Sequence, residues 1–217
     1  SLNEFAASPY RTSGGALTAD GIVSGIGPLT KTGPGTLVFA NANTNSYSGD
    51  TIVREGTLEL RKPNFAVAVP GDLVIGPAPF NSSAIVRFFQ SGSMTAARTA
   101  TVNAGSLVGL NGNGQLLSRL NLNDGGDAQT GPGLLSFPVG GLVAVGSLGQ
   151  LGSHASSYLS GNLGLPANAT LTFAVGPYAP TAPFDFKPEL EMFAQMAAPA
   201  ESPNFERAGI AKNGPGT

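Results

Sequence analysis

The stretch that decides the fold runs from Gly27 to Leu60 and reads GPLTKTGPGTLVFANANTNSYSGDTIVREGTLEL. It holds three short runs, Leu37–Phe39, Thr51–Val53 and Leu58–Leu60, separated by clusters of Gly, Asn, Ser and Asp. Runs of this kind between turn-forming residues predict brief β-strands, and no helical period fits them. The outer residues of each run stand two apart, so they point to the same face of a strand. One face of each strand is therefore predicted to be buried.

The same stretch resembles the autotransporter-associated β-strand repeat, also called the passenger-associated transport repeat. The pattern of that repeat is approximately L-T-K-T-G-x-G-T-L-x-L, then N-x-Y-x-G-x-T-x-V, then G-T-L-x-L. Here residues 29–37, 45–53 and 56–60 read LTKTGPGTL, NSYSGDTIV and GTLEL. The resemblance implies a right-handed parallel β-helix in a secreted or surface-exposed bacterial protein.

The composition favours one elongated, folded, all-β body. Only 11% of the 217 residues are charged, while Gly numbers 31 and Pro 17, and this balance is typical of strands joined by tight turns. A hydrophobic content of 41% and a formal net charge of −2 argue against disorder. Cysteine is absent, which excludes disulfides and thiolate chemistry.

The charge pattern also limits the partners. The chain has 11 Lys and Arg against 13 acids and no basic run, so it lacks the electrostatic signature of nucleic-acid or anionic-membrane binding. No apolar stretch approaches the roughly 20 residues of a membrane span, so we expect no membrane insertion. The chain opens at Ser1 without a signal segment, and we interpret it as a processed or excised piece.

Strand-like runs continue beyond the motif at a spacing of roughly ten residues, which suits a sandwich, a barrel and a β-helix equally. The resemblance selects the β-helix, because looser matches carry it to about Leu148. Leu190–Ala198 is the one place where a helical turn would be comfortable, since acids stand near its start and Pro199 follows it. We therefore divide the chain into an opening segment (1–26), a β-helix core with the repeat motif (27–175, motif 29–60), an irregular Pro- and aromatic-rich segment (176–207) and the start of a second repeat copy (208–217).

The predicted fold is a single right-handed parallel β-helix with short Gly-, Asn- and Pro-rich turns. Coils of roughly 20 residues stacked about 4.8 Å apart would give about ten coils and a rod of about 50 Å. The side chains expected in its interior are Leu37, Phe39, Tyr47, Val53, Leu58, Leu60, Leu73, Ile75, Val86, Phe88, Leu107, Leu110, Leu117, Leu120, Leu135, Phe137, Val143 and Val145.

The last ten residues repeat the start of the motif. Residues 208–217 restate residues 27–36, with Lys212 in the place of Lys31. Because Lys31 falls in a turn between strands, we expect it to cap carbonyls or to deter edge pairing. The repeated tail suggests that units join head to tail and form a filament. They would be either successive segments of one polypeptide or separate subunits whose terminal strand adds to the next rod.

Two groups of residues invite a chemical interpretation. His154 stands beside Ser153 and Ser156, but neighbours in sequence rarely have the geometry of a catalytic triad, and no Gly-x-Ser-x-Gly elbow is present. Asp124 and Asp127 flank a Gly-Gly turn that could hold Ca²⁺ weakly, yet the ligand ladder of a calcium-binding loop is missing. We expect a surface histidine and a solvated turn.

Parallel β-helices also host enzymes that act on polysaccharides, so paired carboxylates matter. Glycoside hydrolysis needs two carboxyl groups roughly 5 to 9.5 Å apart, whereas the acids of this chain are isolated in sequence. Asp50 and Glu55 could share a solvent face, with Arg54 as the only nearby base. We assign no catalytic, cofactor-binding or metal-binding residue.

We therefore expect a secreted, non-enzymatic structural protein of the bacterial surface. It would be a rod or a filament-forming unit whose partners are copies of itself and, secondarily, cell-surface glycans. The alternative is a β-helical protein that binds or degrades polysaccharide, for which aromatic and acidic side chains along one groove would be the sign.

Overall fold

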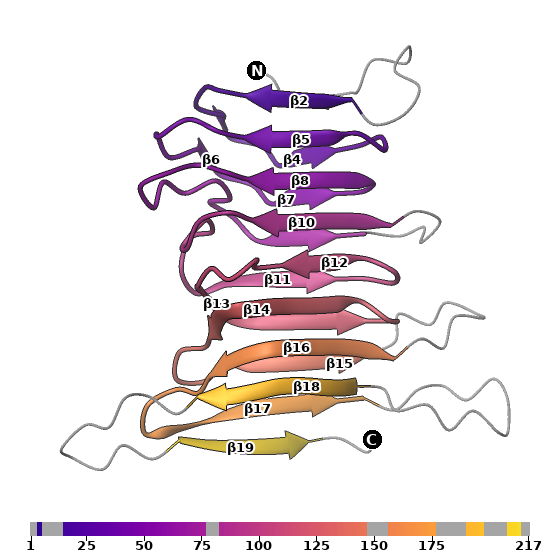
Figure 1. Cartoon of the computed structure of the whole chain (residues 1–217), viewed down its shortest axis with the longest axis vertical. Coiled ribbons are helices and arrows are strands. Elements are labelled where there is room, and N and C mark those ends of the chain that lie inside the picture. The colour runs from indigo at the N-terminus through magenta and orange to yellow at the C-terminus, as the bar shows by residue number, and fades with distance from the viewer. Residues whose placement is uncertain are drawn as a thin grey trace, which may run out of the picture.

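The computed structural model describes residues 4–5, 15–76, 83–146, 156–176, 190–197 and 208–213. These residues form a right-handed parallel β-helix in which the chain coils from one end of a rod to the other (Figure 1). Every pairing between the named strands is parallel. The predicted fold class is confirmed.

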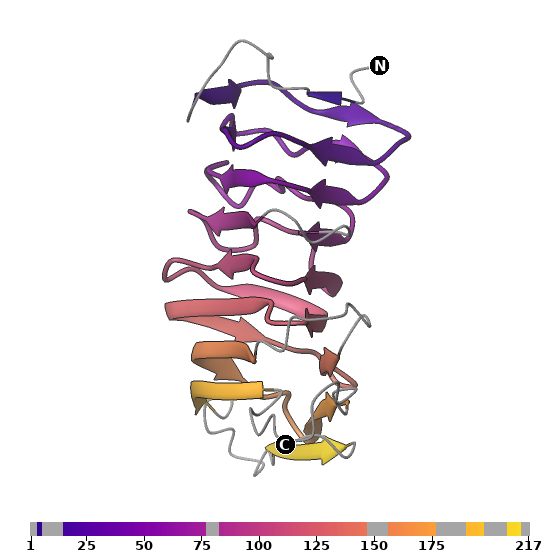
Figure 2. The same ribbon diagram turned by 90° about the vertical axis from the view of Figure 1, so that its right-hand side faces the viewer.

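Two long sides of each coil are parallel sheets, here called sheet A and sheet B, which face each other across the interior (Figure 2). Sheet A consists of β1 (Glu4–Phe5), β4 (Leu29–Lys31), β7 (Thr51–Val53), β9 (Leu73–Ile75), β11 (Arg98–Val102), β13 (Gln115–Asn123), β15 (Leu142–Gly146), β17 (Ala169–Val175) and β19 (Ala208–Asn213). Sheet B consists of β2 (Ala16–Ala19), β5 (Thr36–Phe39), β8 (Gly56–Leu60), β10 (Ala84–Phe88), β12 (Leu107–Gly109), β14 (Asp127–Ser136), β16 (Ser157–Gly164) and β18 (Leu190–Ala197).

A third, shorter side closes each coil. It begins with the pair β3 (Ser24–Gly25) and β6 (Ser46–Tyr47), and an isolated bridge from Val69 to Met94 continues it. Further along the rod, parts of the longer strands β13, β14 and β16 form this side. There Gln115 pairs with Leu135, and Leu135 pairs with Leu163. The coil is therefore three-sided along the part of the rod that the structure describes.

The coils are longer than predicted, and they lengthen toward the C-terminal end of the rod. Near the N-terminal end Leu29 pairs with Thr51 and Thr51 with Leu73, and these steps along the chain already exceed the predicted coil length. The step from Phe173 to its partner Lys212 is the longest in sheet A. The described part of sheet A has nine strands, which span about 38 Å at about 4.8 Å per spacing. This described span is shorter than the predicted rod, because each coil takes up more residues than predicted.

The interior is built from columns of apolar side chains, one residue from each coil. The register fixes the column of sheet B as Leu17, Leu37, Leu58, Val86, Val108, Ala128, Leu159 and Met192. Its inner members are buried. Each buried side chain of this size stabilises the fold by about 1.5 to 3 kcal/mol relative to exposure. The columns therefore hold successive coils in register.

All the predicted interior residues are buried except Leu107, which is only half-buried. Leu107 pairs with Ile85 and Asp127 on the outward side of sheet B, and its neighbour Val108 continues the interior column. The prediction for Leu107 is wrong because successive side chains of a strand point to opposite faces of the sheet. The register turns Val108 toward the interior, so Leu107 points outward.

The helical turn predicted at Leu190–Ala198 is also wrong. Leu190–Ala197 is strand β18 and pairs residue for residue with Ser157–Gly164 of β16. The residues Leu, Glu, Met, Ala and Gln of this segment are good helix formers, but helix propensity is a weak prior that tertiary context overrides. Here the unpaired edge of β16 supplies the hydrogen bonds that the backbone needs.

Glycines stand where successive coils pass closest to one another. A Cβ atom on Gly49 would lie 2.6 Å from the carbonyl carbon of Gly27 and would also strike Pro28, on the preceding coil. Gly56 adopts a φ of +70° and a Cβ there would lie 2.5 Å from the carbonyl oxygen of Gly35. These glycines of the motif are required because backbone fills the space that any side chain would need.

The variant Gly49→Ala tests this requirement. We expect it to lower the free energy of unfolding by about 2 kcal/mol or more, since the backbone of two coils must separate. Gly21→Ala is the matched control, because nothing lies within 4 Å of its added Cβ and its φ is not positive; it should stay within about 0.5 kcal/mol of the parent. Urea unfolding followed by circular dichroism measures both, and equal effects would contradict the stacking argument.

Candidate functional site

The motif lysine lies inside the corner between β4 and β5. Lys31 is only 3% exposed, and its Nζ donates hydrogen bonds to the carbonyl oxygens of Gly33, at 2.8 Å, and Glu55, at 2.7 Å. The two acceptors belong to successive coils, so one ammonium group joins them. Burial lowers the pKa of Lys31, and the nearby Glu55 carboxylate opposes that shift. The expectation that Lys31 caps carbonyls is confirmed.

The motif asparagine joins three coils. Asn45 is buried, and its Oδ1 accepts a hydrogen bond from the Val23 backbone nitrogen at 3.0 Å, while its Nδ2 donates to the Ala68 carbonyl at 2.8 Å. Val23 precedes Asn45 by one coil and Ala68 follows it by one. The side chain thus supplies hydrogen-bond partners to backbone groups of the preceding and the following coil. Water molecules could replace these bonds only if the core opened to admit them.

The motif tyrosine fills the third side of the coil. Tyr47 is buried, and its hydroxyl hydrogen-bonds to Thr51 Oγ1 and donates to the Ala68 carbonyl at 3.4 Å. Burial raises the pKa of the Tyr47 phenol, and the bond to Thr51 partly offsets this. The hydroxyl group of Tyr47 therefore has hydrogen-bond partners, although its ring lies in the apolar interior.

A second buried ammonium was not expected from the sequence. Lys62 is fully buried and its Nζ donates to the Asn43 carbonyl at 2.8 Å, one coil earlier. Burial lowers its pKa, and the charge of Asp20 opposes the shift. Its position follows from the packing of the loop after β8, and no spacing in the sequence marks it.

The residues Lys31, Asn45, Tyr47, Gly49 and Gly56 fall within one continuous stretch of the sequence. A family model described as passenger-associated-transport-repeat matches residues 29–60. Residues 29–60 are similar to this repeat. Comparison with curated proteins and with solved structures gave no match. The matched stretch runs from β4 to the end of β8, and its Lys31, Asn45 and Tyr47 are among the residues that join neighbouring coils.

The structure describes some of the residues that the sequence analysis weighed for catalysis or metal binding. Ser153 and His154 lie outside the described residues, and Ser156 is buried. Asp124 is buried at a corner with a φ of 49°, whereas Asp127 accepts a hydrogen bond from the Tyr158 backbone nitrogen at 2.9 Å. Among the described residues, no three His, Asp or Glu side chains gather as a metal site requires.

Asp50 and Glu55 stand just outside the two ends of strand β7, five residues apart in the chain. Asp50 is exposed and Glu55 is half-buried. No described segment forms a helix of the length and apolar character that crosses a bilayer.

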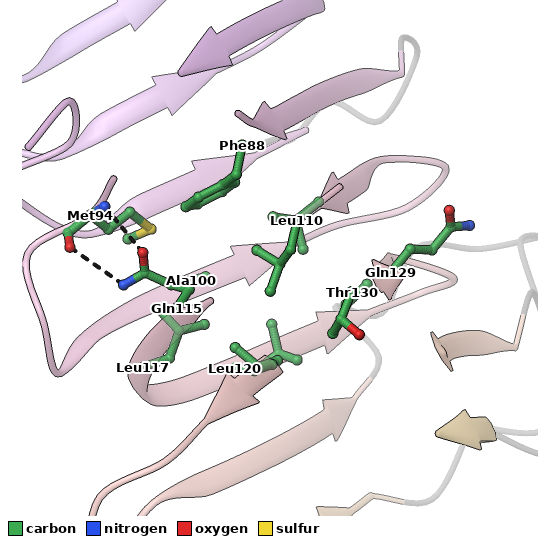
Figure 3. A pocket seen from close by; sticks show the side chains of 12 residues that line it. Phe88, Met94, Ala100, Leu110, Gln115, Leu117, Leu120, Gln129 and Thr130 are labelled. Carbon is green, nitrogen blue, oxygen red and sulfur yellow. Dashed lines mark hydrogen bonds between the residues drawn. The ribbon is translucent and has the colours of Figure 1, made fainter. Parts of the chain in front are cut away.

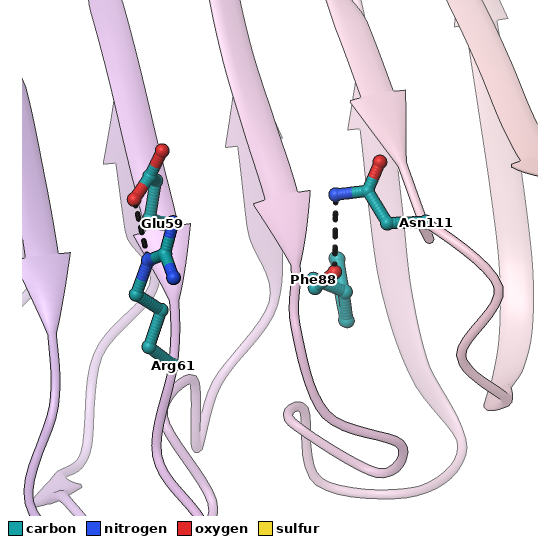
Figure 4. Close-up of polar contacts among 4 residues, drawn as sticks. All are labelled: Glu59, Arg61, Phe88 and Asn111. Carbon is teal, nitrogen blue, oxygen red and sulfur yellow. Dashed lines mark hydrogen bonds and ion pairs between the residues drawn. The ribbon is translucent and has the colours of Figure 1, made fainter.

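Residues on the strands of sheet B and just beyond their ends also make polar contacts near the surface. Arg61 forms an ion pair with Glu59 at 2.7 Å, and its guanidinium lies 3.7 Å from the centroid of the Phe89 ring. On a later coil Asn111 Nδ2 donates to the Phe88 carbonyl at 3.2 Å (Figure 4). These contacts continue the coil-to-coil ties onto the surface, and exposed pairs of this type contribute about 0.2 to 1 kcal/mol.

The interior holds a cavity of about 10 Å³ between the coils of β10 to β14, lined by apolar side chains including Phe88 and Leu120 (Figure 3). Gln115 stands at its side and forms hydrogen bonds with the Met94 backbone nitrogen at 3.2 Å and carbonyl at 3.4 Å. A volume of this size is about that of one water molecule at most. It is a packing defect and too small for an organic ligand.

Asn45→Ala tests the asparagine tie. We expect a loss of about 2 to 4 kcal/mol in the free energy of unfolding, because a buried N–H and a buried carbonyl lose a partner. Asn43→Ala is the control. Asn43 is exposed, and its backbone N–H and carbonyl form hydrogen bonds with Asn41 and Lys62 that alanine keeps. If both variants unfold at the same urea concentration, Asn45 does not hold the coils together.

Tyr47→Phe should have an effect that depends on pH. At pH 7 it should cost about 1 kcal/mol through the lost hydroxyl contacts. The folded state keeps the phenol proton because the pKa of Tyr47 is raised, whereas the unfolded chain releases it above pH 10. The phenol therefore destabilises the folded parent as pH rises, by about 1.4 kcal/mol at pH 11.

The stability difference between the parent and Tyr47→Phe should thus shrink or reverse between pH 7 and pH 11. Urea unfolding at each pH measures it. A difference that stays constant over this range would show that the phenol ionises as readily in the folded rod as in the unfolded chain.

Proposed function

We propose that this chain is a structural rod of a secreted bacterial surface protein, without catalytic activity, in which units continue end to end. The observation that supports this most directly is the state of the two ends of the rod. The interior column of sheet B begins at Leu17, which is 50% exposed, and ends at Met192, which is 38% exposed. Both ends therefore present the apolar interior to solvent.

The two ends are complementary because each presents a terminal residue of the same interior column of sheet B. Within the described residues, no strand pairs with the outer edge of β2 or β18 in sheet B. An open strand edge is a template for pairing with another chain. If one rod stacked on the next, Met192 would meet Leu17 of the following unit and the column would continue. Such a contact is heterologous and does not close, so it extends into a filament.

The tail takes part in a different way from the one expected. Residues 208–213 form β19, which pairs with β17 of the same rod, so this part of the tail is not free to add to another unit. It does lie in sheet A, as the matching motif residues of β4 do. The remaining template is the outer edge of β19, which would receive the first strand of the next unit.

The secretion and surface location rest on the repeat, whose family is associated with passenger transport. A β-helix suits that role, because each coil pairs only with its neighbours and can be added in sequence. The same description covers a unit within one longer polypeptide and a separate subunit. Incubation with pectin-like and algal polysaccharides, followed by assay of reducing ends, tests the absence of catalysis.

Association is tested on the purified chain by sedimentation velocity over a range of concentrations, with electron microscopy of the products. We expect end-to-end oligomers that lengthen with concentration and change little with salt, since few charges lie at the ends. Leu17→Lys and Met192→Lys should each abolish oligomers by placing a charge in the apolar contact. Both positions are half-exposed, so a lysine can reach water without unfolding the end coil.

Val139→Lys is the control for these variants. Val139 is exposed on a turn along the side of the rod, away from both ends, so its lysine variant should associate like the parent. Monomers at every concentration, or oligomers that persist in both end variants, would contradict stacking through the sheet B column.

A further inference from the structure

One part of the outer surface differs in chemistry from the rest of the rod. It lies over the last three strands of sheet B, where the register sets Asp127, Tyr158 and Glu191 side by side on successive coils. The next outward row contains Gln129, Ser160 and Phe193. Aromatic, carboxylate and amide side chains thus occupy one small field on a flat sheet.

The aromatic side chains of this field face solvent. Tyr158 is 40% exposed and Phe193 is 69% exposed. Their rings are nearly parallel, with an interplanar angle of 12° and centroids 6.4 Å apart. Because Phe193 is mostly exposed, its ring contributes little to the stability of the fold. Exposed aromatic rings rimmed by polar groups mark binding surfaces.

Two carboxylates flank the tyrosine. Glu191 and Asp127 are the neighbours of Tyr158 on either side, and both raise the pKa of its phenol, with Glu191 as the larger cause. Two strand spacings separate the acids, which is about 9.6 Å along the rod. One oxygen of Asp127 already accepts the Tyr158 backbone N–H. The field therefore offers mainly hydrogen-bond acceptors around a ring.

The charges of the described residues around this field disfavour an anionic ligand. Between residues 120 and 197, no described residue is Lys or Arg. The amides of Gln129 and Gln195 add donors and acceptors without charge. The outer face of sheet A at the same coils differs, since it presents small side chains such as Ala144 and Ala174. Among the described residues, this combination without a neighbouring cation lies on sheet B near the C-terminal end of the rod.

We propose that this field binds a neutral polysaccharide chain. A pyranose ring has an apolar face of C–H groups that packs on an aromatic ring, and its hydroxyls donate to carboxylates and exchange hydrogen bonds with amides. The open sheet surface fits an extended chain lying across the coils. This site is independent of end-to-end association, so either proposal can fail while the other stands.

The test is calorimetric titration of the purified chain with hexasaccharides of three kinds. Neutral chains (cellohexaose, mannohexaose and laminarihexaose) are the probes, with the hexamers of galacturonate and of chitosan as anionic and cationic comparisons. We expect at least one neutral chain to bind and the galacturonate hexamer not to bind. Phe193→Leu keeps an apolar side chain but removes the flat ring, and it should weaken binding roughly tenfold.

Phe89→Ala is the matched control, because Phe89 is another outward aromatic on sheet B but lies coils away beneath Arg61. It should leave binding within about twofold of the parent. Glu191→Gln keeps the shape of the site and should weaken binding by a smaller factor than Phe193→Leu. Circular dichroism confirms that each variant keeps the strand content of the parent.

The outcomes separate the proposal from its competitors. Failure of every neutral chain to bind would overturn it, and so would binding that Phe193→Leu leaves unchanged. Tighter binding of the chitosan hexamer than of any neutral chain would overturn the assignment to a neutral sugar, because the acids would then be recognising a cation. Loss of neutral-sugar binding in Phe193→Leu but not in Phe89→Ala would support the site as described.

Discussion

The structure depends on the hydrogen bonds between parallel coils. Each strand pairs with the equivalent strand of the coils before and after it, so every coil must follow the path of its neighbour at about 4.8 Å. This constraint decides what each position can hold. Inward positions stack into apolar columns such as Leu37, Leu58 and Val86. Some corner positions, such as Gly49 and Gly56, come too close to the preceding coil for a side chain, and the outward positions are the freest to vary.

Polar residues inside the rod follow from the same constraint. Corners interrupt the ladder, so backbone carbonyls and N–H groups there need other partners. Lys31 and Asn45 supply them from within, each reaching a neighbouring coil. A buried ammonium is costly to desolvate, and its pKa is lowered accordingly. The bonds to two carbonyls offset that cost and fix the spacing of the corner.

The ends of the rod and its outward faces are not used by the hydrogen bonds between coils. Both proposals about function rest on these surfaces. The ends expose the same apolar column and the same kind of strand edge, and the proposal of end-to-end stacking rests on these two features. The outward faces differ from each other although the backbone beneath them is alike. Sheet A presents small side chains near its C-terminal end, whereas sheet B presents Tyr158, Phe193 and their acidic neighbours.

The sequence by itself indicated short strands with one buried face in the repeat, because Leu37 and Phe39, like Leu58 and Leu60, stand two apart between turn-forming residues, a local pattern that needs no knowledge of neighbours. The resemblance to a known repeat then selected the parallel β-helix. The sequence also indicated the role of Lys31. Only the tertiary structure decided what depends on pairing between distant segments. The edge of β16 made Leu190–Ala197 a strand despite its helix formers, and the register turned Val108 inward in place of Leu107. Asp127, Tyr158 and Glu191 are neighbours on successive coils of unequal length. Because the numbers of residues between them differ, no regular spacing in the sequence marks them as neighbours.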